Sequence, residues 1–314
     1  MILITGGTGF IGSHTVRALH ELGETCLLFQ RSATSIPDHL ADVPVLVEQG
    51  DVTDRDAVLD VGRRHRITGI VHLTGYAEWL SGPDAAAPAA RRALSPLFNI
   101  IDAAQTWGVD RVSVASTIGV YGGVDAEGPL REDMPVLLSA PHPIPRSKKI
   151  SELLTEQLAE ASGIEIINLR ISGTWGPRGH DDPFFAAPAL VHAAARGRAP
   201  DFSAQIAQPY ADDALDLCYV KDTGRAIAML QRADTLSHRT YNIGSGRSTS
   251  NADIMTALSD VGAPVEYELP TGATSSMPPM DIERLAKDTG FAPEYDTERA
   301  VADYLAWLKA GNVR

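Results

Sequence analysis

Thr5-Gly6-Gly7-Thr8-Gly9-Phe10-Ile11-Gly12 is the stretch that decides the fold of this chain. An apolar run precedes it and a segment with helical spacing follows it, Met1 to Ile4 and Ser13 to Leu22. Between a strand and a helix, Gly6 permits a tight turn, Gly9 lets the backbone approach a pyrophosphate, and Gly12 removes a side chain where helix and strand pack closely. The stretch therefore predicts a dinucleotide whose phosphates face the N–H groups at the helix N-terminus. The alternative is a glycine-rich turn without a ligand.

The N-terminal half alternates short apolar strands with helices. Strands are expected at Ile2–Thr5, Thr25–Gln30, Val45–Glu48, Gly69–Leu73, Arg111–Ala115 and Ile164–Arg170, and helices at Ile11–Leu22, Asp54–Arg64, Pro88–Trp107 and Ser147–Ser162. This alternation indicates an α/β fold with a Rossmann-like doubly wound parallel sheet. After Gly173 the rhythm becomes irregular. We therefore expect a dinucleotide-binding domain over 1–173 and a smaller C-terminal substrate lobe over 174–314, with some segments returning to the sheet.

The composition is that of a globular protein without a basic surface. The 314 residues are 44% hydrophobic and 21% charged, and the net charge of −13 argues against a nucleic-acid partner. Cys26 and Cys218 lie in separate apolar runs, so we expect buried thiols in a reducing compartment. No apolar run is long enough to cross a bilayer, the first strand leaves no room for a signal peptide, and the histidines show no metal-ligand spacing. A cytoplasmic protein that binds no metal, membrane or nucleic acid is expected.

The residues that end the second strand predict which dinucleotide is bound. An acidic side chain there accepts hydrogen bonds from the adenosine ribose of NAD, whereas an arginine accommodates the 2′-phosphate of NADP. Here the strand ends in Gln30, Arg31 and Ser32, without a carboxylate. Arg31 and Ser32 therefore favour NADP over NAD, although a solvated arginine is common at a strand end. Asp51 and Val52 follow the third strand and are expected beside the adenine, unless Asp51 only caps the next helix.

With these residues assembled, the chain resembles the extended short-chain dehydrogenase/reductase family, which contains the nucleotide-sugar epimerases and dehydratases. The resemblance covers nearly the whole length. The matching segments are Thr5–Gly12, Gly50-Asp51-Val52, Val71-His72-Leu73, Ala115 to Gly122, Arg146-Ser147-Lys148, Gly176-Pro177-Arg178, Tyr219 to Asp222 and Tyr241 to Gly244. Their order and spacing, rather than any one of them, carry the resemblance.

The resemblance implies hydride transfer between a nicotinamide and a carbinol or carbonyl carbon. Thr117 matches the hydroxyl that hydrogen-bonds the substrate oxygen. Lys148 matches the lysine that lowers the pKa of a catalytic tyrosine and holds the nicotinamide ribose. Cofactor contacts are implied for Gly6, Gly9, Phe10, Ile11, Gly12, Arg31, Ser32, Asp51, Val52, Leu73 and Lys148. Relatives often dimerise through two helices that correspond to Pro88–Trp107 and Ser147–Ser162, so a homodimer is expected.

The chain departs from the family pattern at the tyrosine. Ile144 stands four residues before Lys148, where relatives carry the proton-transferring tyrosine, and an isoleucine can neither donate nor accept a proton. A neighbouring group in the cleft could replace it, or the chemistry could need the nicotinamide but no tyrosine. His142 is the first candidate for the proton donor, because an unperturbed imidazole titrates near neutrality. Tyr76, Glu78, Tyr121 and His180 are expected to line the substrate site, although Tyr121 is commonly a packing residue in relatives.

Further departures concern the substrate. Ile118 and Gly119 replace the acidic pair of the dehydratases, while Gly173 and Leu215 replace an asparagine and an arginine that commonly contact a sugar nucleotide. A smaller or less anionic substrate is therefore expected. The predicted function is an NAD(P)-dependent oxidoreductase or epimerase acting on a small hydroxy, keto or sugar-like molecule with a non-standard proton donor. The alternative is a catalytically silent NAD(P)-binding protein with a regulatory or partner-binding role.

Overall fold

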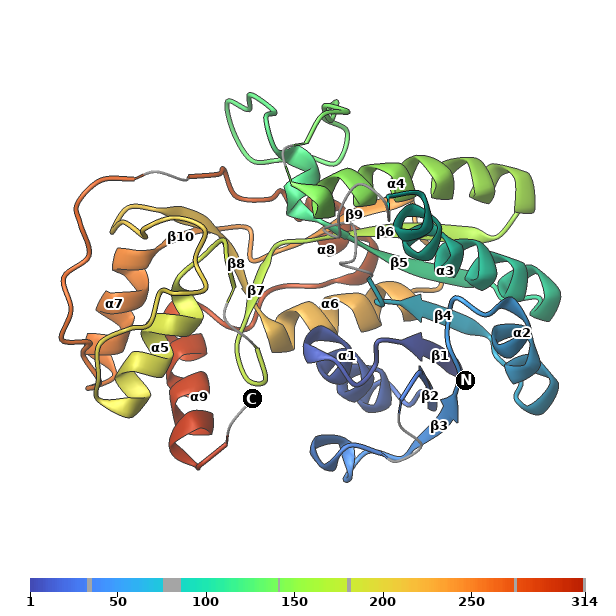
Figure 1. Ribbon diagram of the computed structural model, residues 1–314, viewed down its shortest axis with the longest axis horizontal. Helices are drawn as coiled ribbons and strands as arrows, with labels where there is room; N and C mark the ends of the chain where they lie inside the picture. The colour runs from blue at the N-terminus through green and yellow to red at the C-terminus, as the bar shows by residue number, and fades with distance from the viewer. Residues whose placement is uncertain (33–35, 76–85, 141, 180–181, 274–275, 313–314) are drawn as a thin grey trace.

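A computed structural model describes residues 1–32, 36–75, 86–140, 142–179, 182–273 and 276–312. Its main feature is a seven-stranded parallel sheet of order β3-β2-β1-β4-β5-β6-β9 (Figure 1). The strands are β1 (Ile2–Thr5), β2 (Cys26–Gln30), β3 (Val45–Gln49), β4 (Gly69–His72), β5 (Arg111–Thr117), β6 (Glu165–Ile171) and β9 (Thr240–Ile243). The doubly wound α/β fold is thus confirmed. The strand order reverses next to β1, so the carboxyl ends of β1 and β4 are where a ligand is expected in this class of sheet.

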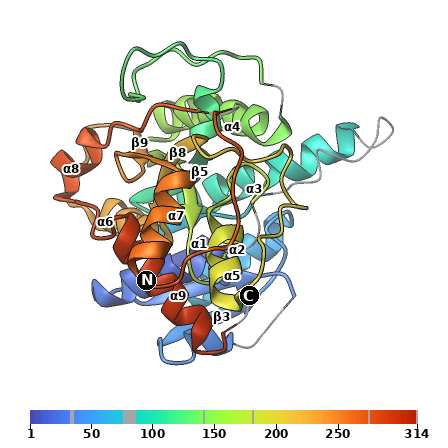
Figure 2. The ribbon, with the colours of Figure 1, turned by 90° about the vertical axis from the view of Figure 1, so that its left-hand side faces the viewer.

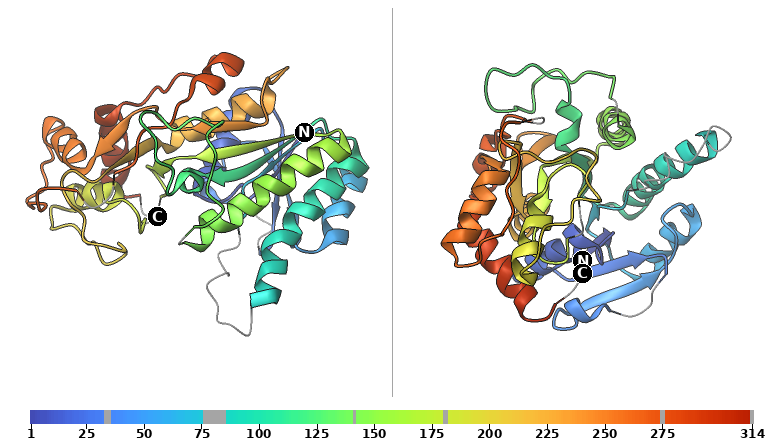
Figure 3. Two further views of the ribbon diagram at one scale, coloured as in Figure 1. Left: turned by 90° about the horizontal axis from the view of Figure 1, so that it is seen from above. Right: turned by 60° about the vertical axis from the view of Figure 1, so that its left-hand side comes forward.

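Helices cover both faces of the main sheet (Figures 1 and 3). The helices on one face are α1 (Phe10–Glu21), α6 (Val220–Arg232) and α8 (Glu283–Thr289), and those on the other are α2 (Arg55–Arg64), α3 (Ala86–Trp107) and α4 (Pro143–Ser162). Side chains such as Val16 and Ile227 bury the first face, while Val61 and Ile100 bury the second. Strands with a core on each side are apolar throughout, which is why the sequence shows them as continuous apolar runs.

A smaller layer lies beyond the main sheet and faces the viewer in Figure 2. It consists of a three-stranded sheet of order β10-β8-β7 and three helices. Its elements are β7 (Gly173–Trp175), β8 (Ala214–Tyr219), β10 (Ser248–Ser250), α5 (Ala187–Arg196), α7 (Asn251–Asp260) and α9 (Thr297–Lys309). Trp175, Tyr219 and Tyr304 pack edge to face in its core. The division at Gly173 and the substrate role of this layer stay predictions.

Most element boundaries of the main sheet and its helices lie within one or two residues of those expected, and two of the differences have a visible structural cause. The helix predicted to begin at Ser147 begins at Pro143, because prolines are tolerated in a first helical turn and His142 caps it. The strand predicted to end at Ala115 continues to Thr117, which pairs with Ile171. Cys26 and Cys218 are buried free thiols, as expected. Within the described residues, every helix is too short or too polar to cross a membrane.

Candidate active site

The glycine turn between β1 and α1 has the close contacts that its sequence predicts. Gly6 has φ 75°, a conformation that glycine adopts without strain, and its carbonyl accepts a 3.0 Å hydrogen bond from the Gly9 amide. A Cβ on Gly12 would lie 2.0 Å from the Gly6 carbonyl oxygen, so helix and turn approach more closely than any other residue allows. A Cβ on Gly9 would meet the same oxygen at 3.2 Å. The closest packing is therefore at Gly12. There the helix α1 packs against the turn at Gly6 and Gly7 and not against strand β1.

The N-terminus of α1 has no polar side chain of its own to cap it. Gly9 is its N-cap, and no acidic residue lies in its first turn. In contrast, α2, α7 and α9 are capped by the side chains of Asp54, Ser250 and Asp296. The helix end carries partial positive charge, and its glycine cradle would be filled by a Cβ. These features fit the diphosphate of a dinucleotide.

The segments expected at the adenosine end of such a cofactor lie at the ends of β2 and β3. Arg31 and Ser32 follow β2 directly and are exposed. Asp51 Oδ1 accepts hydrogen bonds from the amide and the hydroxyl of Thr53, each at 2.8 Å. Asp54, not Asp51, caps α2. The backbone of Val52 is fixed by a 2.9 Å hydrogen bond from Asn99 Nδ2.

The segments expected at the nicotinamide end lie at the carboxyl ends of β4 and β5. The Leu73 amide donates to the Thr5 carbonyl at 3.1 Å. Thr117 ends β5, and its hydroxyl oxygen accepts a 3.2 Å hydrogen bond from the Gly119 amide. A Cβ on Gly119 would lie 2.7 Å from Pro145 Cγ, so this strand end packs against the first turn of α4. Ile144, in the same turn, is 41% exposed.

Lys148 and Ile144 lie one turn apart on one face of α4. Burial lowers the pKa of Lys148 to about 8, with Glu152 acting in the opposite direction. Burial lowers the pKa of His72 to about 3, with the charge of Lys148 as a further cause. His72 lies at the end of β4 and its Nδ1 is 2.7 Å from Thr5 Oγ1. The charge of Lys148 is therefore felt at the strand ends where the nicotinamide ribose is expected.

The depressed pKa predicts that Lys148 destabilises the cofactor-free protein. The native chain releases the proton at about pH 8, whereas the unfolded chain holds it to about 10.5. Stability therefore rises with pH between these values. Lys148→Met should raise the free energy of unfolding at pH 7 by up to about 3 kcal/mol, with the gain fading by about pH 10.5. Urea denaturation at several pH values measures this difference. Lys309→Met, at an exposed site, is the control, and an equal effect in both variants would contradict the assignment.

His142 is the N-cap residue of α4. Its Nδ1 accepts a 3.3 Å hydrogen bond from the Ile144 amide, which leaves Nε2 as the nitrogen that carries the proton in the neutral ring. The ring packs edge to face on Phe184, with centroids 5.1 Å apart. His142 therefore lies where the start of α4 meets Phe184, six residues before Lys148.

The substrate residues predicted from the sequence have different outcomes. Tyr121 is fully buried, and its hydroxyl accepts from Arg170 and donates to Asn242 Oδ1, each at 2.8 Å. Both partners belong to the protein, so the structure places Tyr121 in the core rather than facing a substrate. Tyr76, Glu78 and His180 lie outside the described residues.

Sequence analysis missed the polar network beneath the site. Glu152 accepts from Ser116 and forms a buried ion pair with Arg170 at 2.8 Å. Arg170 stacks over the Tyr121 ring. The Lys148-x-x-x-Glu152 spacing is a local signal for this pair, because residues four apart share a helix face. Its partners on β5 and β6 gave no local signal.

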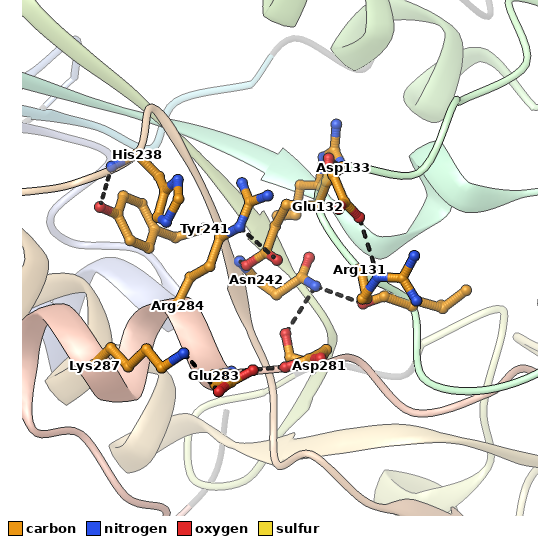
Figure 4. A network of polar contacts seen from close by, with 12 residues as sticks. Arg131, Glu132, Asp133, His238, Tyr241, Asn242, Asp281, Glu283, Arg284 and Lys287 are labelled. Atoms are coloured by element: carbon orange, nitrogen blue, oxygen red, sulfur yellow. Dashed lines mark hydrogen bonds and ion pairs between the residues drawn. The ribbon is translucent and has the colours of Figure 1, made fainter.

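The network continues to the far edge of the sheet (Figure 4). Asn242 Nδ2 donates to the carbonyls of Leu130 and Asp281 at 2.7 and 2.9 Å. Glu132 accepts from the Asn242 amide and pairs with Arg284 at 3.4 Å. These contacts fix the segment after β5 against β9 and the start of α8. The side chains at the carboxyl end of β5 are thus held by a rigid support.

A nucleotide-binding α/β protein is the class that this sheet, turn and helix define. The chain belongs to the NAD dependent epimerase/dehydratase family, whose model matches residues 2–244. Together with the resemblance at the motifs, this confirms the extended short-chain dehydrogenase/reductase relationship.

Curated relatives and solved structures agree with this membership. The chain is 25% identical to UDP-glucose 4-epimerase of Azospirillum brasilense, over 98% of this chain and 92% of that one. It is 27% identical to dTDP-glucose 4,6-dehydratase of Streptomyces griseus, over 98% and 93% of the two chains. The structure resembles UDP-glucose 4-epimerase of Thermotoga maritima, solved with UDP-glucose, with a TM-score of 0.79, 21% identity and 99% of each chain covered. It also resembles dTDP-glucose 4,6-dehydratase of Bacillus anthracis, solved with NAD, with a TM-score of 0.80, 18% identity and coverage of 99% and 97%.

Proposed function

We propose that the protein is an NAD(P)-dependent oxidoreductase or epimerase acting on a small hydroxy, keto or sugar-like substrate with a non-standard proton donor. The observation that carries the proposal is the first turn, where Gly12 leaves room only for backbone and α1 begins without a side-chain cap. Family membership supports it. When bound, the nicotinamide cofactor would accept and return a hydride.

The residues at the strand ends have separate roles in this proposal. Thr117 would orient the substrate oxygen, since its hydroxyl hydrogen remains to be donated while its oxygen accepts from Gly119. Lys148 would hold the nicotinamide ribose. His142 would exchange the proton through Nε2, because Nδ1 is engaged in the cap. Ile144 would leave an apolar wall where relatives carry the tyrosine.

The cofactor preference is proposed from the end of β2. The family description and the bound NAD in a similar structure support NAD as the first cofactor to test. Arg31 and Ser32 are exposed and stand in the sequence where an acidic residue is typical of NAD binding, and this supports NADP.

A contact in the small sheet supports a substrate that is less anionic than a sugar nucleotide. A Cβ on Gly173 would lie 2.7 Å from Leu215 Cδ2 and 2.9 Å from Leu217 Cδ2. The side chains of Leu215 and Leu217 therefore fill the space that an asparagine at position 173 would need. Gly173 and Leu215, the two positions that depart from the family pattern, thus pack against each other. At both positions a polar residue of the family is replaced by an apolar one.

Purified protein is expected to be stabilised by dinucleotide. At 100 times Kd, the ligand should add about 2.7 kcal/mol to the free energy of unfolding and raise Tm by a few degrees. Nicotinamide absorbance then measures hydride exchange over a panel of alcohols and ketones that includes UDP-glucose. Thr117→Val should lower the exchange rate about 100-fold with dinucleotide affinity retained. Absence of any shift with NAD, NADH, NADP and NADPH would refute the proposal.

A silent dinucleotide-binding protein is the second candidate, because Ile144 cannot transfer a proton. It predicts the same thermal shift and no hydride exchange with any member of the panel. In either case we propose a homodimer through α3 and α4, where Phe98 and Leu153 are exposed. Sedimentation of the wild type and of Leu153→Glu measures the oligomeric state.

A further inference from the structure

Three buried side-chain atoms have no hydrogen-bond partner among the described residues: His39 Nε2, Ser172 Oγ and Arg178 Nε. Buried polar atoms are ordinarily hydrogen-bonded. Each of these three atoms could therefore bond to a group from outside the described residues. Ser172 follows β6 and lies apart from the other two. His39 and Arg178 come from opposite halves of the sequence, and the segments that carry them both contact α1, at Arg17 and at His14.

The turn that carries Arg178 packs against the start of α1. Gly179 closes the turn by donating to the Gly176 carbonyl at 3.0 Å, and a Cβ on Gly179 would lie 3.0 Å from the Phe10 ring. The Pro177 carbonyl is 3.2 Å from His14 Nε2. Arg178 has φ 71°, the one positive φ outside glycine in the part of the chain described here. Strain of this kind persists where the surroundings require a particular side-chain direction.

His39 is held on the same flank by α1. It lies in a short 3-10 helix, η1 (Asp38–Leu40), on the segment that follows β2. Arg17 donates to the His39 carbonyl at 2.6 Å and forms an ion pair with Asp42 at 2.7 Å. Burial lowers the pKa of His39 to about 4, and the next cause is the charge of Arg178, followed by Arg17 and, in the opposite direction, Asp38. The two unpartnered nitrogens are thus electrostatic neighbours.

Arg178 Nε can only donate a hydrogen bond, and His39 Nε2 donates in the tautomer that carries its proton there. The Asp42 carboxylate accepts hydrogen bonds from Arg17. Neither His39 Nε2 nor Arg178 Nε has a hydrogen-bond partner among the described residues. An anion placed between them would satisfy both donors, and a guanidinium favours phosphate because its N–H groups match the phosphate oxygens.

We propose that Arg178 and His39 form a phosphate subsite on the flank of α1 that takes the 2′-phosphate of NADP or a free phosphate. The inference rests on the proposed dinucleotide site and extends it. It assigns discrimination between the two cofactors to residues beyond the strand end, because Arg178 belongs to the C-terminal half.

Calorimetry with NADP⁺, with NAD⁺ and with inorganic phosphate alone tests the subsite. The wild type should bind NADP⁺ at least tenfold more tightly than NAD⁺. Arg178→Gly should remove that difference while leaving NAD⁺ affinity within twofold. Glycine accepts φ 71°, so this variant should fold and melt at a higher temperature without ligand. Arg198→Ala, at an exposed arginine, is the control.

The titrations with NADP⁺, NAD⁺ and inorganic phosphate distinguish a 2′-phosphate site from a free-phosphate site. They also test the subsite separately from the proposed function. Phosphate that binds the wild type but not Arg178→Gly, with NADP⁺ and NAD⁺ equal, would support the free-phosphate form. The imidazole signals of His39 should then shift on adding phosphate, with its pKa rising from about 4. If Arg178→Gly and His39→Gln keep the wild-type preference for NADP⁺ and the wild-type affinity for phosphate, the inference is overturned. NAD⁺ binding in the same variants would still uphold the proposed function. Failure of every dinucleotide to bind would refute the proposed function, and the phosphate arm would still decide the subsite.

Discussion

Gly12→Ala is expected to destabilise the protein by about 3 kcal/mol or more, because the new Cβ would lie 2.0 Å from the Gly6 carbonyl oxygen. Both partners of this clash are backbone, so no side chain can turn away to relieve it. A Cβ would also meet Gly7 Cα at 2.8 Å. Loss of dinucleotide binding should follow from the displaced turn.

Gly9→Ala is the matched variant. Its Cβ would meet its nearest neighbour, the same Gly6 oxygen, at 3.2 Å, which a small shift relieves. We expect this variant to fold with a loss of less than about 1.5 kcal/mol in the free energy of unfolding. It should bind dinucleotide weakly, because the added methyl group lies on the turn that faces the phosphates. Thermal melting with and without NAD⁺ measures both effects. Equal stability of the two variants would contradict the close approach seen at Gly12.

The second large effect is expected at the buried ion pair beneath the site. The Glu152 and Arg170 side chains are 11% and 7% exposed and 2.8 Å apart. Glu152→Ala should cost about 3–5 kcal/mol, because it leaves the Arg170 guanidinium buried without its carboxylate. Ser116 would lose its hydrogen-bond acceptor, and Tyr121 would lose the carboxylate that positions its partner Arg170.

A double variant distinguishes an unpaired charge from a lost contact. Glu152→Ala with Arg170→Met removes both charges and should recover more than half of the stability lost in Glu152→Ala alone. Urea denaturation of the single and double variants measures the recovery. Additive losses would show that the two side chains contribute to stability independently of each other, which would contradict the expectation.

The sequence was sufficient for the main sheet because its signals are local. The turn at Thr5–Gly12 and the apolar runs of β1, β4 and β6 identify strands whose order follows from right-handed crossovers. The Asp54 carboxylate ahead of a helical pattern is typical of an N-cap, and it caps α2. The true start of α4 was hidden, because Pro143 and Pro145 suggest a break unless His142 is known to cap the helix.

The candidate site was only partly predictable, for a physical reason. Its cofactor motif is contiguous, but the burial of Tyr121 depends on Arg170 and Asn242, which follow it by 49 and 121 residues. The coupling between Gly173 and Leu215 likewise needs the pairing of β7 with β8. Contacts between distant segments leave no periodicity for a local pattern to detect.

The packing of α1 on α6 determines when this protein can finish folding during synthesis. A Cβ on Gly224 would lie 2.6 Å from the His14 carbonyl carbon, so the two helix backbones touch although more than 200 residues separate them. The sheet edge β9 is translated later still. In a nascent chain that has emerged only as far as Gly173, α1 alone covers this face of the sheet, and the rest of the face stays exposed until α6 and α8 have been synthesised.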